Sequence, residues 1–514
     1  MEAFGIEKKH AIQWIDENKA QITEMSDRIW LYAEPSLFEY RSSNLLANKL
    51  KEAGFKVEHG VAGLGTAFVA TYGEGKPVLC TIAEYEAVED SSQMPVPYKC
   101  PVLPGLSGCY DMHHGLGAGA VGAALAIKFI MEKYNIQGTF KVFGTPAEKI
   151  SVGKNIMGSK GVFETLDGCV SWHPSNETSA DRYISAQIRC NNQTAHIFEG
   201  TSSYNAMPWG GSNALHALEL MDIAVQFIKD TIIPISSYPT ISSILDRECV
   251  NYAVSSIPGV AKATYVSRAL TRKENEMIQQ RLFDCANAAA LALGVTVKNE
   301  VITGTWEPIP NHTLANIAHK NIEVIRPPRF TVKDLEYGRL IQKSIGLEPT
   351  DTPFGDMSIA PPGSRPIRNV MSTTDATTFC YKCPYVMITT NYLGAWGWPN
   401  WATISYSLTN IAHQSLLTAA KIIATTIIDL FKFPQVLRDA KEEFNKRTEG
   451  VKWYSPMPED RILPKSDPLP KEHYLAIVEA FKKGPKWEGW EPDLSERIEK
   501  IGQKVLEEFD EISK

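Results

Sequence analysis

Three short stretches of the chain carry side chains that bind divalent metal ions or transfer protons. They contain Asp111, His113 and His114 in one segment, Glu148 and Lys149 in a second, and His173 in a third. Carboxylate oxygen and imidazole nitrogen are suitable ligands for zinc, manganese or iron(II), and an Asp-x-His pair can place both on one ion. A polar loop that caps a buried helix would show the same pattern, so each stretch alone leaves both interpretations open.

The elements around these residues predict that they lie at strand-to-loop transitions. Residues 116–131 contain one charged side chain, Lys128, among small and apolar residues, which is typical of a helix buried on all sides. Residues 140–143 are predicted to form a strand, and residues 167–174 a second one that delivers His173 to a loop. Strands that alternate with helices indicate a mostly parallel α/β sheet covered by helices, and such sheets place their sites at strand ends.

The composition indicates a globular protein of more than one domain. A chain of 514 residues is too long for one ordinary core, and 44% of it is hydrophobic. A formal net charge of −7 gives no electrostatic reason to bind nucleic acid. The first residues lack the apolar core of a signal peptide, no run reaches about 20 apolar residues, and nine cysteines, an odd number, fit reduced thiols. We therefore expect a cytoplasmic protein that binds neither nucleic acid nor membranes.

The motifs together resemble a known superfamily. Asp111-Met112-His113 before the small-residue helix, then residues 146–149 with the sequence PAEK, then residues 172–174 with the sequence WHP, follow one another in its order. This pattern is similar to the two-zinc exopeptidase and aminoacylase superfamily (peptidase family M20), in the branch of the aminobenzoyl-glutamate hydrolase B subunits. Further matches, AEYEA at 83, GTWEPIPNHTL at 304, STTDAT at 372 and IAHQSLLTAAK at 411, extend the resemblance over most of the chain until it fades after 454.

The resemblance implies a zinc-exopeptidase-like catalytic domain interrupted by an inserted α+β domain. The pattern of predicted elements changes at Ile184. From there, strand-like segments with alternating residues and two helical segments follow one another. We therefore predict a catalytic domain in residues 1–183 and 304–432, a lid and dimerisation domain in residues 184–303, and a C-terminal extension in residues 433–514. In that extension Ile498, Ile501, Val505 and Phe509 predict an amphipathic helix that packs on its own body or on a partner.

Family members hold two ions, and this chain retains the ligands of one. The resemblance implies that Asp111, in the place of a family cysteine, binds one divalent ion (zinc, manganese or iron) together with His113 and His173. Lys149 stands where the family has a second glutamate ligand, and Pro399 stands where it has a distal histidine. A dication about 4 Å from an ammonium is repelled by roughly 8 kcal/mol at an effective dielectric constant of 20. We therefore predict a single-metal site.

The resemblance also assigns catalytic roles. Glu148 takes the place of the general base that activates the attacking water and later protonates the leaving nitrogen. Lys149 either stabilises a developing oxyanion in place of the lost ion or points to solvent from a degenerate site. Tyr204 stands where a lid histidine of the family reaches a dimer-related active site and binds the reacting carbonyl.

The remaining site predictions concern the substrate. His114, next to the predicted ligand His113, is a reserve ligand or a substrate contact. Trp398 and Asn400 are predicted to contact the substrate, and an aromatic wall formed by Trp396, Trp398 and Trp401 would suit a flat aromatic molecule. Three tryptophans packed in the core are the alternative.

The predicted function is a metal-dependent amidohydrolase that cleaves a C–N bond of a small aromatic substrate. It is expected to form a homodimer through the lid and could use a related partner subunit. One alternative is a non-catalytic or partner-dependent subunit of a hydrolase. Another is an enzyme of the same fold that performs deamination or a metal-free lyase reaction.

Overall fold

The body of the protein is built on a six-stranded sheet. The structure, a computed structural model, describes residues 5–231, 239–246, 254–394, 398–464, 466–485 and 494–512. The strand order is β1-β2-β4-β3-β5-β12, in which β3, β4, β5 and β12 run parallel and β1 and β2 are antiparallel neighbours. The strands are β1 (Lys56–His59), β2 (Phe68–Glu74), β3 (Val78–Ala83), β4 (Gly138–Gly144), β5 (Gly168–Ser175) and β12 (Tyr385–Asn391). The predicted α/β class with a mostly parallel sheet is confirmed.

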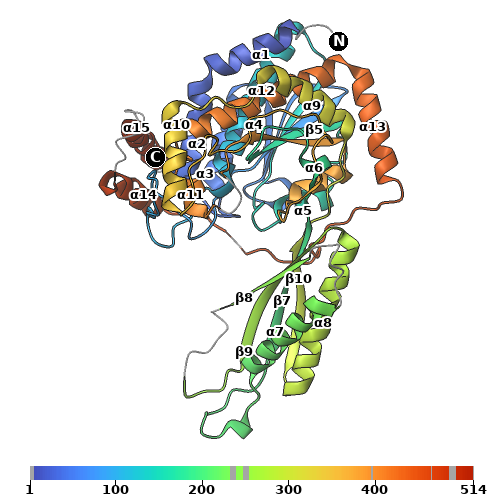
Figure 1. The fold of residues 1–514 in the computed structure, drawn as a ribbon, viewed down its shortest axis with the longest axis vertical. Helices are drawn as coiled ribbons and strands as arrows, with labels where there is room; N and C mark the ends of the chain where they lie inside the picture. The colour runs from blue at the N-terminus through green and yellow to red at the C-terminus, as the bar shows by residue number, and fades with distance from the viewer. Residues whose placement is uncertain are drawn as a thin grey trace.

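Helices cover both faces of this sheet (Figure 1). The helices of the body before the C-terminal extension are α1 (Ile6–Glu17), α2 (Lys19–Tyr32), α3 (Tyr40–Glu52), α4 (His113–Tyr134), α5 (Gly153–Ser159), α6 (Arg182–Ser185), α9 (His312–Ile325), α10 (Val332–Ser344), α11 (Asn400–Ile404) and α12 (Asn410–Lys432). Helix α4 packs against α12 and α2. Its small residues permit close contact: a Cβ added at Gly119 would lie 3.2 Å from the ring of Trp172. This packing fixes the N-terminus of α4 beside the sheet.

The N-terminal region differs from the sequence prediction. The apolar pattern of residues 7–54 predicts two helices, the second closed by Gly54, whereas the structure has three, α1 to α3. Asn18 separates the first two, and its side chain donates a hydrogen bond to the carbonyl oxygen of Trp14, which gives the backbone an alternative to the helix. Ala33, in the left-handed conformation with φ 47°, ends α2. Apolar periodicity continues through such breaks, which is why the pattern did not reveal them.

A second sheet forms a separate arm below the body (Figure 1). Its strand order is β10-β7-β9-β8, with α7 and α8 packed against it. The elements are β7 (Cys190–Glu199), α7 (Ala214–Thr231), β8 (Thr240–Leu245), β9 (Val260–Ala269), α8 (Arg272–Leu293) and β10 (Thr296–Gly304). Of the two predicted lid boundaries, residue 184 lies just before β6 (Ala186–Gln187) and residue 303 lies in β10. Strand β6 pairs with β11 (Arg368–Asn369) of the body.

The C-terminal extension folds back on the body of its own chain. It contains α13 (Pro434–Thr448), α14 (Lys471–Lys483) and α15 (Leu494–Ile512). Helix α13 packs on α9, and α14 and α15 pack on each other and on α2. Ile498, Ile501 and Val505 are buried in these contacts, whereas the side chain of Phe509 lies outside the described part. Of the two arrangements that the sequence left open, the described residues show packing on the same chain.

Two helices, α4 with the short turn before it and α12, are long and apolar enough to cross a membrane. In each, 89% of the most apolar window is buried inside the fold. Their composition therefore agrees with a place in the core, where each packs against the other.

Candidate metal and active site

His113 occupies the first position of α4, directly after a strained turn. Asp111 and Met112, in the short 3-10 helix η2 (Tyr110–Met112), both have φ 59°, the left-handed region that non-glycine residues rarely adopt. Ala147, before Glu148, has φ 58°. Each such residue costs about 1–3 kcal/mol, and such conformations persist where the surrounding structure enforces them, often at functional sites. The backbone on both sides of the predicted site is thus held in a special conformation.

Three carboxyl groups surround the imidazole of His113. Its Nε2 atom lies 3.7 Å from Glu84 Oε2 and 3.8 Å from Glu148 Oε2, and its Nδ1 atom lies 3.2 Å from Glu86 Oε2. All four side chains are buried. Burial by itself would lower the pKa of His113, as would the charge of Lys149, but Glu86 and Glu84 raise this pKa above its usual value. The carboxyl groups around the imidazole thus favour its charged form.

Sequence reasoning missed Glu84 and Glu86. Both follow β3, and Tyr85 between them donates a hydrogen bond to the Thr66 carbonyl oxygen in another direction. Alternate residues of an extended segment project to the same side, which explains why both carboxyl groups reach His113. The segment AEYEA, at the end of a buried strand, carried this signal.

Lys149 faces the carboxyl groups and not the solvent. Its ammonium lies 3.0 Å from Asp111 Oδ2 and 3.5 Å from Glu148 Oε2, and 20% of its side chain is exposed. Burial would lower the pKa of Lys149, but Asp111 and Glu148 raise it above its usual value. Although burial would raise the pKa of Asp111, the charge of Lys149 lowers it to about 2. The pair is therefore charged at neutral pH.

A second buried lysine holds the other side of Glu84. Lys154, in α5, lies 2.8 Å from Glu84 Oε1 and 2.6 Å from Asp375 Oδ1, and all three side chains are buried. Asp375 begins the 3-10 helix η6 (Asp375–Tyr381), and burial raises its pKa to about 7. Sequence reasoning missed this contact because residues 221 positions apart form it. It fixes Glu84 so that its second oxygen faces His113.

His173 lies beside His113 at the end of β5. The two ring centroids are 6.2 Å apart and the rings are perpendicular. The Nδ1 atom of His173 is 2.8 Å from the carbonyl oxygen of Pro174, which can only accept a hydrogen bond. Nδ1 therefore carries the proton and leaves Nε2 with a free electron pair, the form that binds a metal. Burial, and then the charge of Arg182, lowers the pKa of His173, which keeps the ring neutral.

Two other predicted residues lie apart from the carboxyl cluster. His114 is directed to the carbonyl oxygen of Ser407, 3.1 Å from its Nε2 atom, and burial lowers its pKa to about 4. Tyr204 is 59% exposed and its backbone pairs with Ser256. Tyr204 follows the C-terminal end of β7, where Glu199 pairs with Thr296 of β10. The other end of β7 joins the body, so within one chain Tyr204 is remote from His113.

The predicted aromatic contacts divide between the core and the surface. Trp398 is buried, with its ring centroid 6.4 Å from that of Phe354 and 6.3 Å from that of Tyr406. Asn400 is exposed at the first position of α11, a helix that packs against η2. Trp396 lies outside the described residues. The described part therefore shows a tryptophan in the core and a polar residue at the surface, on the element next to Asp111.

The buried cluster has the properties of a cation site. Donor atoms of Glu84, His113 and Glu148 all lie within 4.8 Å of one another. The Nε2 atom of His113 is buried and has no hydrogen bond with the described residues. Five carboxyl groups and two ammonium groups meet here: Glu84, Glu86, Asp111, Glu148 and Asp375 with Lys149 and Lys154. Because unbalanced buried charge is costly, a bound dication would relieve the excess of negative charge.

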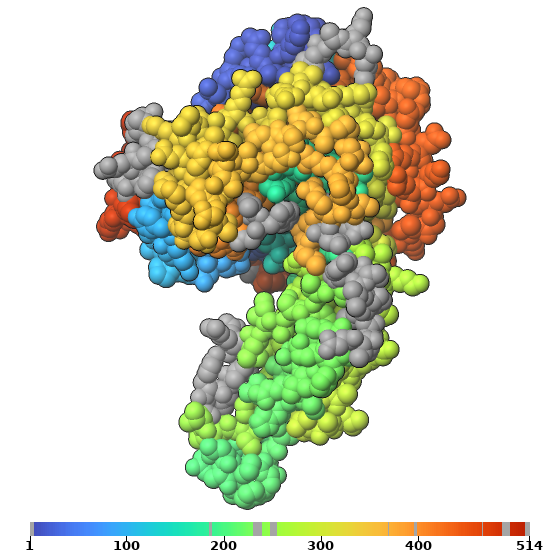
Figure 2. All heavy atoms as spheres, viewed as in Figure 1, coloured from blue at the N-terminus to red at the C-terminus, as the bar shows by residue number. Residues whose placement is uncertain are grey.

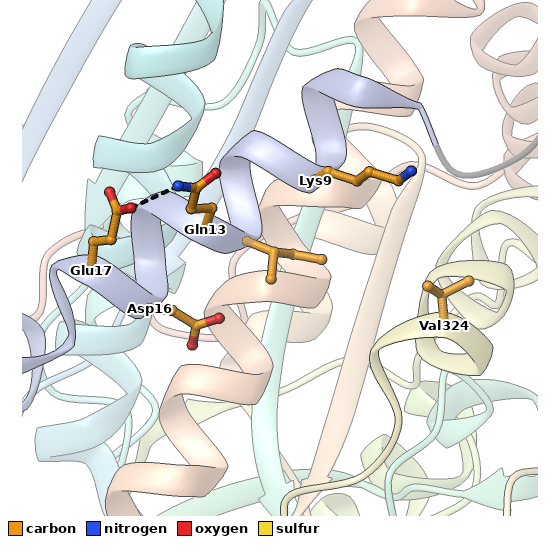
Figure 3. A pocket seen from close by; sticks show the side chains of 6 residues that line it. Lys9, Gln13, Asp16, Glu17 and Val324 are labelled. Carbon is orange, nitrogen blue, oxygen red and sulfur yellow. Dashed lines mark hydrogen bonds between the residues drawn. The ribbon is translucent and has the colours of Figure 1, made fainter.

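A groove of about 630 Å³ lies on the surface between α1 and α9, away from the buried cluster (Figure 3). Lys9, Asp16 and Glu17 of α1 and Val324 of α9 line it, and Gln13 donates a hydrogen bond to Glu17 within α1. The space-filling view shows the body above and the narrower arm below it (Figure 2). The converging buried groups at the strand ends are the better candidate site.

Comparisons with known proteins find relatives that are named as hydrolases. No family model matches the chain. The B subunit of p-aminobenzoyl-glutamate hydrolase from Escherichia coli is 27% identical over 481 residues, 87% of this chain and 96% of that protein. The chain is a homologue of this hydrolase component. The mouse Xaa-Arg dipeptidase is also 27% identical, over 85% of this chain and 92% of its own length. The predicted class, a hydrolase acting on C–N bonds, is confirmed.

Solved structures show the same fold. The aminobenzoyl-glutamate utilization protein of Klebsiella pneumoniae has a TM-score of 0.55 at 13% identity, over 80% of this chain and 98% of its own. A dinuclear metal-binding peptidase of the M20 family from Bacillus subtilis has a TM-score of 0.51 at 14% identity, over 80% and 99% of the two chains. The resemblance noted from the motifs is thus confirmed for the fold.

Proposed function

We propose that the protein is a metal-dependent amidohydrolase that cleaves the C–N bond of a small aromatic amide. The observation that carries this proposal is the buried imidazole of His113, whose Nε2 atom faces two carboxyl groups without a hydrogen bond to the described residues. The relatives named as a hydrolase component and a dipeptidase support hydrolysis of an amide bond. The cysteines that the structure describes are free, which supports a cytoplasmic location.

One ion would be held by Asp111, His113 and His173. When bound, it would polarise the amide carbonyl and make water more acidic. The neutral His173 and the negative charge around His113 support this ligand set. Glu84 and Glu148 with His113 form a second possible set, but it would occupy the only general base that the resemblance assigns. A second ion is disfavoured because the ammonium of Lys149 lies between Asp111 and Glu148.

The residues of the chain itself would carry out the proton transfers. Glu148 takes a proton from the attacking water and returns it to the leaving nitrogen. Lys149, charged and 3.5 Å from Glu148, stabilises the negative charge that develops on the carbonyl oxygen. Glu86 holds His113 through its Nδ1 atom and accepts a hydrogen bond from the backbone nitrogen of Lys149, which couples the two loops.

The two named relatives suggest a direct test of the substrate class. The purified chain is assayed with p-aminobenzoyl-glutamate and with Xaa-Arg dipeptides under the same conditions. We expect a higher kcat/KM for the aryl amide. Preferential cleavage of the dipeptides would contradict the aromatic part of the proposal, and activity only after addition of a related partner protein would favour the partner-dependent alternative.

Metal content gives a second prediction. Elemental analysis of the purified chain should find at most one equivalent of zinc, manganese or iron per chain. Replacing His113 by Ala should weaken metal binding by at least about tenfold, because it removes a donor common to both possible ligand sets. His216→Ala, at an exposed position of α7, is the control and should leave the content unchanged. Two equivalents in the wild-type chain would contradict the single-ion site.

Assembly gives a third prediction. We propose a homodimer through the lid, supported by β8 at the edge of the four-stranded sheet and by exposed apolar side chains such as Ile244 and, on α7, Phe227, each 68% exposed. An edge strand with apolar side chains invites pairing with a second copy. The resemblance implies that Tyr204 then reaches the body of that copy. Light scattering should show a dimer, and Ile244→Lys should shift it toward the monomer. Val332→Lys, at an exposed apolar position of the body, should not, and a wild-type monomer at all concentrations would refute the proposal.

A further inference from the structure

The C-terminal extension lies close to the loops that carry the candidate site. Figure 1 shows α14 and α15 at the side of the body beside α2 and α3. Trp30 of α2 packs edge-on against Phe481 of α14, with ring centroids 5.2 Å apart. Three side chains of the extension form polar contacts with the body: Ser466 and Tyr474 with the turn between α2 and α3, and Arg497 with the segment at Leu408.

The contact of Tyr474 is fully buried. Its hydroxyl donates a hydrogen bond of 3.0 Å to Glu34 Oε1. The same oxygen accepts a hydrogen bond from the backbone nitrogen of Arg41, and Oε2 accepts two more from the backbone nitrogen and the hydroxyl of Ser42. A buried carboxyl group is costly unless its hydrogen bonds are made, so these four bonds fix the turn between α2 and α3.

This turn holds the segment that carries Glu86. The carbonyl oxygen of Glu34 accepts a hydrogen bond of 2.7 Å from the backbone nitrogen of Ala87. Ala87 follows Glu86, whose Oε2 lies 3.2 Å from the Nδ1 atom of His113 and whose Oε1 accepts a hydrogen bond of 2.9 Å from the backbone nitrogen of Lys149. From Tyr474 to His113, the contacts thus pass through only two short segments of the chain.

A parallel set of contacts reaches the loop of the predicted base. The hydroxyl of Ser466 donates to the carbonyl oxygen of Leu37 at 2.6 Å, and the hydroxyl of Tyr40 donates to the carbonyl oxygen of Ser466 at 2.8 Å. Between them in the sequence, the buried Glu39 accepts a hydrogen bond of 2.8 Å from the backbone nitrogen of Ala147. The extension therefore supports both loops that face His113.

The guanidinium of Arg497 supports a third segment. It donates a hydrogen bond to the carbonyl oxygen of Leu408 and lies 3.2 Å from Asp27 Oδ2. The neighbouring carbonyl oxygen, of Ser407, lies 3.1 Å from the Nε2 atom of His114. This contact therefore supports the carbonyl group that faces His114, the second residue of α4 and the neighbour of the candidate ligand.

We propose that Tyr474 is a positioning residue for the hydrolytic site and that it acts through Glu34 and Ala87 on Glu86. The inference rests on the proposed metal site and assigns a role to an extension that the family motifs do not explain. Groups that orient a metal ligand usually change metal affinity or activity by about 10–100-fold when removed. Because three contacts separate Tyr474 from His113, we expect the lower end of that range.

Zinc affinity of the full-length chain tests this inference. Tyr474→Phe removes only the hydroxyl and should weaken the binding of Zn²⁺, measured by chelator competition, by about tenfold. Tyr265→Phe is the matched control, because that buried tyrosine donates a hydrogen bond of 2.9 Å to a carboxyl group, Asp222, inside the lid. It should leave zinc affinity unchanged.

A double-mutant cycle separates positioning from general stability. If Tyr474 acts through Glu86, Tyr474→Phe should have little further effect on zinc affinity in a Glu86→Gln background. Additive effects, or a lower melting temperature with unchanged zinc affinity, would overturn the inference while the proposed function remains. A wild-type chain that binds none of Zn²⁺, Mn²⁺ and Fe²⁺ would overturn both.

Discussion

Replacing Glu148 by Gln is expected to lower kcat by about 10²–10⁴ with little change in KM. The substitution keeps the size of the side chain and removes the group that accepts the proton. Glu148 is buried, and its Oε2 lies 3.8 Å from His113 and 3.5 Å from Lys149, so the neutral amide can occupy the same space. Steady-state kinetics with the best substrate found for the chain would measure the effect.

The control for this substitution is Glu164→Gln. Glu164 is exposed on the same domain, where it pairs with Lys382, and its replacement should leave kcat unchanged. An undiminished turnover of Glu148→Gln would end the proposal that this residue is the base.

Metal affinity then distinguishes a base from a ligand. Glu84 and Glu148 both lie near the Nε2 atom of His113, and in the alternative ligand set both bind the ion. If Glu148 is the base, Glu148→Gln should retain the metal while losing turnover. If Glu148→Gln and Glu84→Gln both lose the metal, the ion is held by the two glutamates and not by Asp111 and His173.

The site residues that could be predicted are those next to a helix or strand with a recognisable sequence pattern. His113 begins a helix of small apolar residues, Glu148 follows one buried strand and His173 lies at the end of another, so the fold class and three converging segments could be predicted. Lys154 shows no such pattern, because a buried lysine is indistinguishable in sequence from an exposed one, and the STTDAT match that contains Asp375 does not indicate its contact with Lys154. Only the packing of α5 against η6 brings them to Glu84.

The extension shows a second limit of sequence reasoning. Its amphipathic helix predicted a buried face but not the surface that covers it, since apolar contacts are non-directional. The hydroxyl of Tyr474 and the carboxyl group of Glu34 are 440 positions apart, and nothing in either segment indicates the other. For Lys149, the sequence showed that a cation replaces a carboxylate beside the site. Only the structure shows that its charge faces Asp111 and Glu148.

Replacing Lys149 by Glu is expected to lower kcat by about 10²–10³, comparable to the loss of one group that stabilises an oxyanion. The substitution restores the residue type of the family at this position and removes the buried cation. It also places a third carboxyl group next to Asp111 and Glu148, which lie 3.0 and 3.5 Å from the present ammonium. Lys149→Met, which removes the charge without adding another, should show a similar loss of turnover.

The number of metal ions bound per chain shows why Lys149→Glu loses turnover. If Lys149 replaces the second ion of the family, Lys149→Glu should still bind one equivalent and remain impaired, because Pro399 supplies no side-chain ligand. Lys160→Glu, at an exposed position after α5, controls for the change of net charge and should be fully active. A Lys149→Glu chain that binds a second equivalent of metal and keeps its turnover would contradict the proposed role. The lysine would then exclude a second ion without stabilising the oxyanion in its place.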